Sequence, residues 1–329
     1  MTKMHSPGTL RPPPEPDFSV VVPLYNEEEN VALLHRAVTD ALAQGTRTYE
    51  LVLVDDGSRD GTLARAAALV ATDERVRVVE FARNYGQTAA MAAGIHHARG
   101  RVIVTMDGDL QNDPRDIPAM LDLLEQGHDM VAGWRRKRQD EGKRMFVSKV
   151  ANRIINGLLG VSVRDSGCSL KCYRRELIQS LPFYGEMHRF IPALSQMAGA
   201  RIKQVEVRHH PRRFGTSKYG FSRIYKVALD IVSIRFLLRY SQRPRTWMLR
   251  PTLAALLLGL AILLLVEIER PGVIVGWSIV LLFAQLALFL GAWSMLGYFL
   301  SVTEPRVSQF SALAAKLYGY RKPPVREVP

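Results

Sequence analysis

The chain has 329 residues, a net charge of +13 and a hydrophobic fraction of 47%. This positive charge favours anionic partners such as nucleic acid, an acidic membrane surface or phosphorylated substrates. The two cysteines, Cys168 and Cys172, are too few for a disulfide framework and lack the companion ligands of a zinc site, so we expect reduced thiols in a cytosolic compartment.

Short apolar runs alternate with amphipathic segments over much of the chain. Residues 1–17 are rich in proline and lack an apolar run, which is typical of a disordered tail and not of a signal peptide. The apolar runs that follow predict strands at residues 18–26, 49–58, 75–82 and 101–106. The segments between them predict helices at residues 27–43, 64–71 and 87–98, and Asn26 with Glu29 is expected to form a capping box on the first helix. This alternation predicts an α/β fold with a mainly parallel sheet that is covered on both faces.

The C-terminal part of the chain has a different composition. Residues 252–266 and 271–303 carry no charge, and the second run exceeds the roughly 20 residues that span a bilayer. We therefore expect a hairpin of two transmembrane helices within residues 246–303. Lysine and arginine flank this hairpin, whereas its turn contains Glu267 and Glu269. The positive-inside rule then predicts a multi-pass protein of the cell (inner) membrane, with the N-terminal domain and the C-terminus in the cytoplasm.

Basic charge is concentrated just before the hairpin. Residues 199–250 contain thirteen lysines and arginines against only Glu206 and Asp230. Apolar residues at helical spacing among these cations predict amphipathic helices in the bilayer interface. Some of the cations can hold anionic lipid, and others can bind a phosphate that reacts. We find no nucleic-acid motif. The chain is therefore predicted to have five parts. They are a tail (1–17), an α/β domain (18–218), juxtamembrane helices (219–245), the transmembrane hairpin (246–303) and a basic cytosolic tail (304–329).

Carboxylates gather where two predicted strands end. Asp55 and Asp56 end one strand, and Asp107 and Asp109 follow another. In an open parallel sheet, ligands bind beyond the carboxyl ends of the strands, and residues two apart in an extended chain project to the same side. Carboxylate oxygens suit Mg²⁺ or Mn²⁺. Either member of the first pair can also be a simple turn residue. Asp113 is assigned instead as the cap of a helix that begins with proline.

Segments in chain order resemble a known family. The segments VVVPLYNEEENV, VDDGSRDGT, ARNYGQTAAMAAGI and MDGDLQNDP closely resemble the family-2 glycosyltransferases of GT-A fold, a Rossmann-like fold with a mixed, mainly parallel sheet. The segments DSGCSLKCYRR, GEMHRFIP and RRFGTSKYG, with the two C-terminal helices, are similar to those of polyprenyl-phosphate glycosyltransferases. These include dolichyl-phosphate mannose synthases and bacterial undecaprenyl-phosphate glucosyl and aminoarabinosyl transferases. The resemblance covers roughly residues 18–305 and implies inverting transfer of a sugar from a nucleotide sugar to a lipid phosphate.

The resemblance also implies a donor site. It places Asp56 on the base, and it makes Asp107 and Asp109 the ligands of a divalent cation, Mg²⁺ or Mn²⁺, on the diphosphate. Further nucleotide-sugar contacts are expected from Pro23, Tyr25, Glu27, Asp55, Gln111 and Arg135. Tyr25 can equally be a packing residue.

An acceptor site is implied as well. The acceptor phosphate is expected to contact Arg144, Ser148, Arg212, Arg213, Ser217 and Lys218. Among these, Arg144, Ser148, Arg212 and Lys218 join Asp109 as the expected catalytic group. Arg144 and Ser148 can also belong to a solvated helix face. A lipid phosphate is already anionic, so orientation and electrostatic stabilisation suffice without a general base.

Two alternatives to this function were weighed. A family-2 transferase that builds polysaccharide on a hydroxyl acceptor needs a general base, for which Glu186 or a hydrogen-bonded His188 is available, but no Q-x-x-R-W motif is present. A non-catalytic membrane scaffold would not need Asp107 and Asp109. We expect undecaprenyl phosphate and UDP-glucose as substrates, and a product that serves cell-envelope glycosylation. The resemblance further implies a homo-oligomer, commonly a tetramer, and a downstream flippase and glycosyltransferase.

Overall fold

The chain folds into two units in a computed structural model. The structure describes residues 15–136, 163–181, 187–211, 214, 244–269, 274–303 and 314–318. The first unit comprises Met1–Gly220 with Ser308–Pro329, and the second comprises Phe221–Val307. The last segment of the chain therefore belongs to the same unit as the N-terminal part.

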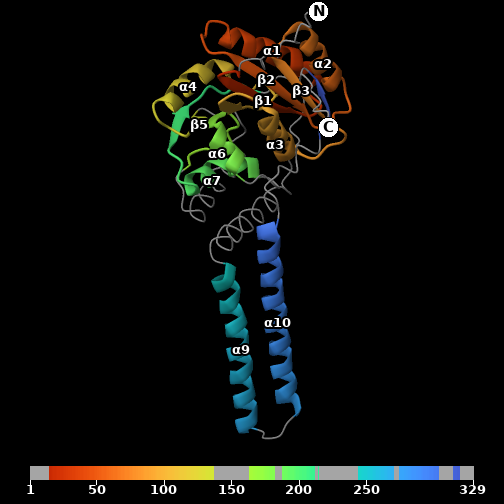
Figure 1. Ribbon diagram of the computed structural model, residues 1–329, viewed down its shortest axis with the longest axis vertical. Coiled ribbons are helices and arrows are strands. Elements are labelled where there is room, and N and C mark those ends of the chain that lie inside the picture. The colour runs from red at the N-terminus through yellow and green to blue at the C-terminus, as the bar shows by residue number, and fades with distance from the viewer. Residues whose placement is uncertain are drawn as a thin grey trace, which may run out of the picture. The chain divides into compact units, whose positions relative to one another are not determined.

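The first unit is built on a mixed sheet (Figure 1). Within the described residues it has eight strands in the order β7-β5-β6-β4-β1-β2-β3-β8. Strand β6 runs antiparallel to β4 and β5, strand β8 runs antiparallel to β3, and the other neighbours are parallel. The strands are β1 Phe18–Leu24, β2 Tyr49–Asp55, β3 Val76–Phe81, β4 Val102–Thr105, β5 Met130–Trp134, β6 Lys171–Arg174, β7 Ile202–Glu206 and β8 Ala314–Tyr318.

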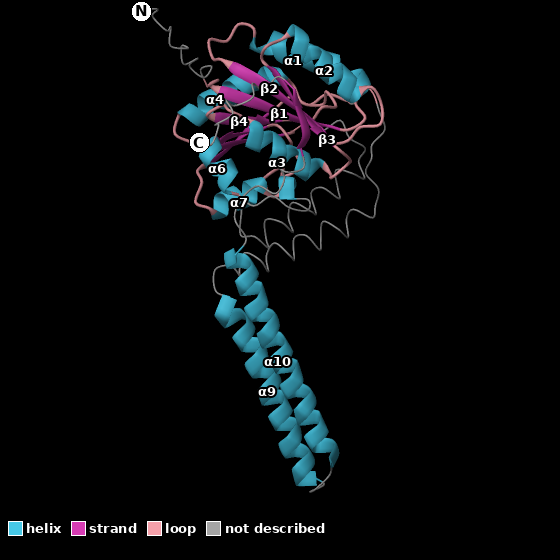
Figure 2. Cartoon of the chain, turned by 45° about the vertical axis from the view of Figure 1, so that its right-hand side comes forward, coloured by secondary structure: helices cyan, strands magenta, loops and turns pink. Residues whose placement is uncertain are grey.

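Helices cover both faces of this sheet. Figure 2 shows α1 and α2 on one side of the strands and α3 on the other. The α-helices are α1 Glu28–Leu42, α2 Thr62–Thr72, α3 Gln87–His97, α4 Ile117–Glu125, α6 Arg175–Ser180 and α7 Ile191–Met197. Two 3₁₀ turns are η1 Pro114–Asp116 and η2 Met187–Arg189.

Alternation along β1 explains this layering. Val20 and Val22 belong to one hydrophobic cluster with Leu34 of α1, whereas Val21, which projects to the other face, lies beside Gly94 of α3. Because both faces of β1 are covered, its sequence is continuously apolar. The predicted strands and helices of the N-terminal region are confirmed, as is the mixed, mainly parallel sheet.

The predicted capping box at the start of α1 is wrong. The helix begins at Glu28, and the Glu27 side chain makes no capping hydrogen bond. Asn26 adopts a positive φ of 52°, and its Oδ1 accepts a hydrogen bond from the backbone N–H of Arg59 at 2.9 Å. The Asn26 side chain is therefore used by a loop 33 residues away, which local spacing does not reveal. The Asp113 cap is confirmed, since its side chain accepts a hydrogen bond from the N–H of Arg115 before the 3₁₀ turn η1.

The C-terminal tail contributes a strand that the sequence analysis did not predict. Strand β8 pairs with β3 and thereby occupies one edge of the sheet. The Tyr318 hydroxyl donates a hydrogen bond to the Glu80 carboxylate at 2.6 Å. Residues 304–329 are thus not only a basic tail, because part of this segment completes the sheet.

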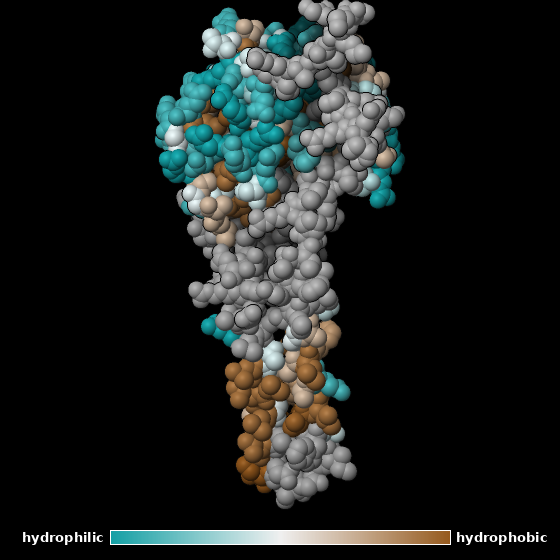
Figure 3. Space-filling view, in the orientation of Figure 1, coloured by the Kyte–Doolittle hydropathy of each residue, from teal (hydrophilic) through white to brown (hydrophobic). Residues whose placement is uncertain are grey.

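Two long helices form the described part of the second unit. Helices α9 Pro244–Glu269 and α10 Ile274–Thr303 lie where the sequence predicts a helical hairpin, and they pack against each other. Figure 3 shows apolar side chains over much of their visible surface, and Leu257, Leu265 and Leu288 are each more than half exposed. Judged by their described residues, neither α9 nor α10 is long and apolar enough to cross a membrane. The transmembrane character of the hairpin is therefore not supported by these residues.

Candidate active site

The two predicted acid pairs meet at one edge of the sheet. Asp55 is the last residue of β2 and Asp107 follows β4, while β1 lies between these two strands. The N–H of Asp56 donates to the Leu24 carbonyl at the end of β1 at 2.9 Å. A Cβ atom on Gly108 would lie 2.5 Å from Leu24 Cδ2, so a larger residue here would require the Leu24 side chain to move. The carboxyl ends of β2, β1 and β4 thus bring both acid pairs together.

The Asp56 carboxylate holds the loop between β3 and α3. It accepts hydrogen bonds from the N–H groups of Tyr85 and Gly86 at 2.7 and 2.9 Å and from the Asn84 side-chain amide at 2.9 Å. Burial raises the pKa of Asp56 to about 6, although these N–H groups favour the ionised form. The role on the nucleobase stays a prediction, and the structure adds a role in fixing this loop.

Asp55 has a different environment from its neighbour. Its side chain is 1% exposed, and one oxygen accepts a hydrogen bond from the N–H of Ser58 at 3.2 Å. The other oxygen is buried and has no hydrogen-bond partner among the described residues. Burial raises the pKa of Asp55, and the hydrogen bonds from Ser58 oppose that rise. The Ser58 hydrogen bond agrees with the turn interpretation of Asp55, and its other buried oxygen remains available as an acceptor, so a role at the nucleotide stays a prediction.

Asp107 and Asp109 form the acidic centre of the site. Asp107 Oδ1 accepts a hydrogen bond from the Gln87 side-chain amide at 2.7 Å, and the Asp107 N–H donates to the Asn112 side chain at 3.3 Å. Asp109 is 6% exposed and accepts a hydrogen bond from the N–H of Gln111 at 3.1 Å. Burial, followed by the charge of Asp109, raises the pKa of Asp107. A half-buried carboxylate on Asp107 and a buried one on Asp109 that repel each other fit a cation, which would remove the repulsion.

Among the described residues, Asp107 and Asp109 are the carboxylates offered to this cation. In the part of the chain that the structure describes, no group of three or more His, Cys, Asp or Glu side chains is placed to hold a metal. A cation that Asp107 and Asp109 bind would therefore complete its coordination with water and with phosphate oxygens, as Mg²⁺ and Mn²⁺ do at nucleotides.

A buried basic pair lies on the other side of Asp107. The Arg135 guanidinium forms a two-point ion pair with Asp165, at 2.7 and 3.0 Å. Lys171 at the start of β6 is 3% exposed, and its ammonium donates to the Ser166 carbonyl at 3.4 Å. Burial lowers the pKa of Lys171, while the charges of Asp165 and Asp107 act in the opposite direction. Arg135 was predicted to contact the nucleotide sugar, and in the structure its guanidinium is engaged by Asp165.

The predicted nucleotide wall lies at the end of β1. Pro23, Tyr25 and Glu27 are half-buried there. The Glu27 N–H donates to the Thr62 hydroxyl at 2.8 Å, which fixes the start of α1 against the start of α2. These residues thus lie on the same edge of the sheet as Asp55.

The loop that carries Asp109 also pairs with the chain that leads into the RRFGTSKYG segment. The Gln111 carbonyl accepts a hydrogen bond from the N–H of His210 at 2.9 Å, and His210 Nε2 lies 3.0 Å from an Asp113 oxygen. Arg212, Arg213, Ser217 and Lys218 follow in the sequence, but they lie outside the described residues, as do Arg144, Ser148 and Glu186. Their contacts with a phosphate stay predictions.

His188 is a structural histidine in this site. It is 8% exposed, and its Nδ1 lies 2.7 Å from the Thr88 hydroxyl at the start of α3. This contact ties η2 to the helix that begins with Gln87. The hydrogen-bonded interpretation of His188 therefore agrees with the structure.

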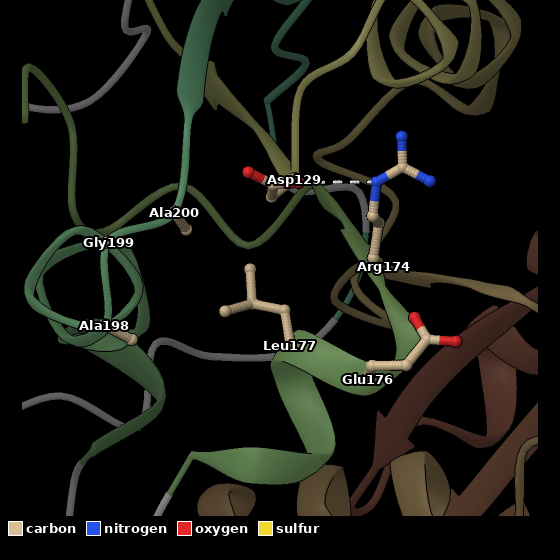
Figure 4. Close-up of a pocket in the computed structure, with 7 residues that line it drawn as sticks. All are labelled: Asp129, Arg174, Glu176, Leu177, Ala198, Gly199 and Ala200. Atoms are coloured by element: carbon tan, nitrogen blue, oxygen red, sulfur yellow. Dashed lines mark ion pairs between the residues drawn. The ribbon is translucent and has the colours of Figure 1, made fainter.

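A separate cavity lies at the opposite edge of the sheet. It has a volume of about 260 Å³ and is lined by Asp129, Arg174, Glu176, Leu177, Ala198, Gly199 and Ala200 (Figure 4). Asp129 and Ala200 precede β5 and β7, so the cavity faces the amino ends of these strands. An ion pair of 3.5 Å between Asp129 and Arg174 crosses it. This cavity is not part of the carboxylate site.

Several residues of the site were not assigned from the sequence. They are Asn84, Gln87, Asn112, Asp165, Ser169 and Lys171. Most of them stand in the segments that carry the family resemblance, so the segments themselves were the available signal. The contacts that give these residues a role join strands and loops that are distant in sequence.

Comparisons with known proteins give a consistent result. Residues 19–181 match the domain described as glycosyl transferase family 2. A dodecaprenyl-phosphate galacturonate synthase of Rhizobium johnstonii is 47% identical over 245 residues, which cover 72% of each chain. An undecaprenyl-phosphate 4-deoxy-4-formamido-L-arabinose transferase of Klebsiella pneumoniae is 36% identical over 284 residues, which cover 85% of each chain.

A solved structure supports the fold. The glucosyl-3-phosphoglycerate synthase of Mycobacterium tuberculosis, in complex with Mn²⁺, uridine diphosphate and phosphoglyceric acid, superposes with a TM-score of 0.52 at 23% identity. The match covers 68% of this chain and 78% of that chain. It supports the GT-A-like α/β fold that the sequence predicts.

Proposed function

The chain belongs to glycosyl transferase family 2, and from this premise we propose that it transfers a sugar from a nucleotide sugar to a polyprenyl phosphate. The observation that carries the proposal is the meeting of Asp107 and Asp109 with Asp55 and Asp56 at the carboxyl edge of the sheet. A nucleotide sugar bound there would have Asp107 and Asp109 for the cation on its diphosphate and Asp56 for its base, with Asp55 close by. The polyprenyl-phosphate acceptor is inferred from the two relatives, which are a dodecaprenyl-phosphate and an undecaprenyl-phosphate sugar transferase.

On the donor side, Asp107 and Asp109 would hold a divalent cation. When bound, this cation stabilises the negative charge that develops on the leaving nucleotide diphosphate. The protein's own contribution is to keep both carboxylates oriented, through the Gln87 amide on Asp107 and the Gln111 N–H on Asp109. Asp56 fixes the adjacent loop, and Pro23 and Tyr25 form the wall beside it.

On the acceptor side, the lipid phosphate is the nucleophile. Its oxygen attacks the anomeric carbon as the bond to the diphosphate breaks, which inverts that carbon and needs no base. Arg144, Ser148, Arg212 and Lys218 are the residues that would bind and orient this phosphate, with Arg213 and Ser217 beside them. Guanidinium groups suit this task because they bind phosphate oxygens at two points. Of the two candidate bases for a hydroxyl acceptor, His188 is buried against Thr88, and Glu186 lies outside the described residues.

The identity of the sugar is the least constrained part of the proposal. Glucose, the leading expectation from the sequence, is not supported, because the names of the relatives give galacturonate and 4-deoxy-4-formamido-L-arabinose. We propose a galacturonate-type or modified pentose donor ahead of glucose. Undecaprenyl phosphate, a tetrameric assembly and a downstream flippase stay predictions.

The helices of the second unit would place the reaction at a membrane. The large apolar side chains of α9 and α10 are exposed, and such a surface is unstable in water unless lipid or protein covers it. We propose that lipid covers it and that the catalytic unit lies on the cytoplasmic side of the cell membrane. The acceptor's polyprenyl chain would then stay in the bilayer during transfer.

The proposal is tested with the purified protein, a polyprenyl phosphate in detergent or vesicles, and a panel of radiolabelled nucleotide sugars. UDP-galacturonate, UDP-4-deoxy-4-formamido-L-arabinose and UDP-glucose form the first panel. We expect label to enter an organic-extractable lipid with one of the first two donors. Transfer to a polysaccharide alone would favour the hydroxyl-acceptor alternative, and the absence of transfer with an extended donor panel would contradict the proposal.

The acceptor assignment has its own matched pair of variants. Arg212→Ala is expected to raise the KM for the lipid phosphate or to slow transfer by about one to two decades, the effect of losing one charge-assisted contact. Arg239→Ala, which removes a cation predicted to hold only the lipid surface, should change the rate little. Nucleotide-sugar binding should be unchanged in both. A loss of nucleotide binding in Arg212→Ala would assign this arginine to the donor diphosphate.

A further inference from the structure

Gln87 joins the two halves of the donor site. It is the first residue of α3, and its side-chain amide donates to Asp107 Oδ1 at 2.7 Å across 20 residues of sequence. We propose that Gln87 is a positioning residue for the cation site, which fixes one oxygen of Asp107 and leaves the other for the cation. This inference rests on the proposed function and assigns a role to a residue that neither the family resemblance nor the comparisons single out.

The position of Gln87 is itself fixed from the nucleotide side. The residue before it, Gly86, has a φ of 96° and donates its N–H to the Asp56 carboxylate at 2.9 Å. The same carboxylate holds Tyr85 and Asn84. Asp56 therefore determines where α3 begins and, through it, where the Gln87 amide lies.

Helix α3 cannot easily adjust its position. Its residues from Thr88 to Ile95 are all buried, and Gly94 lies against Val21 and Val54 with no space for a Cβ atom. A second contact, between Thr88 and His188, holds the first turn of the helix. An amide mounted on an element packed this closely has a defined position, as a positioning group requires.

This arrangement connects two strands that are not neighbours. Asp56 follows β2 and Asp107 follows β4, and β1 separates these strands in the sheet. The connection runs from the Asp56 carboxylate through Gly86 and Gln87 to Asp107. It predicts that nucleotide binding and cation binding strengthen each other, and that Gln87 carries part of this coupling.

The chemistry of an amide suits this role. An amide N–H donates a hydrogen bond that fixes the Asp107 carboxylate without adding a positive charge that would repel the cation. Methionine has a similar length and helix propensity but no donor. Gln87→Met therefore removes the hydrogen bond and keeps the helix.

The coupling is measured by binding and not by turnover. We would titrate the full-length protein with UDP, once in excess chelator and once in saturating Mn²⁺, and measure bound Mn²⁺ by electron paramagnetic resonance. We expect Gln87→Met to bind UDP in chelator as tightly as the unmodified protein. Its gain in UDP affinity from Mn²⁺ should be smaller by about tenfold, and its Mn²⁺ affinity in saturating UDP should fall by the same factor.

A matched variant and a thermal melt control for folding. Gln179→Met changes an exposed glutamine of α6 whose amide contacts the Ile95 carbonyl of α3 at 3.5 Å, and it should leave all affinities unchanged. An unchanged Mn²⁺ effect in Gln87→Met would overturn the inference, and so would an equal loss of UDP affinity with and without Mn²⁺. If Mn²⁺ fails to strengthen UDP binding even in the unmodified protein, the proposed cation-dependent donor site is wrong as well. The unmodified protein thus distinguishes a failure of the proposed function from a failure of the Gln87 assignment alone.

Discussion

The adjacent residues Asp55 and Asp56 have different hydrogen-bond environments, and we expect different roles for them. Asp55 ends β2 with one buried oxygen that has no partner among the described residues, whereas Asp56 has three hydrogen-bond donors on its carboxylate. Side chains of consecutive residues in an extended chain point to opposite sides, so the pair serves two different surroundings. A substitution at one position should therefore not reproduce the effect of the other.

The raised pKa of Asp56 predicts how stability depends on pH. Because the pKa is about 6 in the folded protein and about 4 in the unfolded chain, the folded state binds more protons between these values. The free energy of unfolding should thus fall as pH rises from about 4 to 6. Asp56→Asn should lose this component, which urea unfolding of both proteins at several pH values will measure. An identical pH slope in the two proteins would contradict the raised pKa.

The acidic centre predicts a dependence on a divalent cation. Asp107→Asn and Asp109→Asn should each abolish sugar transfer while the fold is retained, because each removes a carboxylate that the cation needs. A chelator should inactivate the unmodified protein, and added Mn²⁺ or Mg²⁺ should restore it. Asp122→Asn, in the exposed part of α4, is the control and should remain active. Full activity in excess chelator would refute the cation assignment.

Among the elements, α3 packs closely against the sheet at Gly94. Gly94 allows the approach, since a Cβ there would clash with Val21 and lie 2.9 Å from Val54. Helix propensity alone predicts that Gly94→Ala stabilises the protein by about 1 kcal/mol. We expect the clash to outweigh this gain and the free energy of unfolding to fall by about 1–3 kcal/mol, as is typical of overpacking. Urea unfolding decides between these effects, and a stabilised variant would show that α3 is loosely packed.

The predictability of the elements follows from how local their determinants are. Strands β1 to β4 and helices α1 to α3 were predicted because each carries its own apolar periodicity. Strands β6 and β8 were not, since their sequences KCYR and AAKLY lack the apolar run that marks β4 and they are ordered by their neighbours in the sheet. The prediction that Asn26 caps α1 was wrong for a similar reason, because its side chain accepts a hydrogen bond from a distant loop.

The site residues were likewise predicted only where local sequence determines their position. Asp107 and Asp109 follow from the rule that ligands bind beyond the ends of parallel strands, and a short spacing places both on one centre. Gln87 and Lys171 could not be assigned in this way. Their importance depends on groups distant in sequence, since the Gln87 amide donates to Asp107 and the charge of Asp107 acts on the pKa of Lys171.

At the scale of the whole molecule, the path of the chain limits its topology. The second unit, Phe221–Val307, is an insertion into the first unit, because Ser308–Pro329 returns to it and β8 pairs with β3. A segment that leaves and rejoins one folded unit must cross a membrane an even number of times if it crosses at all. The two helices α9 and α10 satisfy this condition as a hairpin.

The topology predicts which sites a membrane-impermeant thiol reagent can reach. The native thiols give little background, since Cys168 and Cys172 are both fully buried and burial raises the pKa of Cys168 to about 11. Glu269→Cys places a thiol at the end of α9, and Asp122→Cys places one on the exposed surface of the first unit.

In sealed right-side-out vesicles, Glu269→Cys should be labelled at once, because the proposed hairpin turn faces the outside. Asp122→Cys should be labelled only after the vesicles are permeabilised, and inverted vesicles should give the opposite pattern. Labelling of Asp122→Cys from outside would place the catalytic unit on the wrong side for a cytoplasmic nucleotide sugar. Equal labelling of both variants in intact vesicles of either orientation would show that α9 and α10 lie on one side of the bilayer, so that the exposed leucines contact its surface and do not cross it.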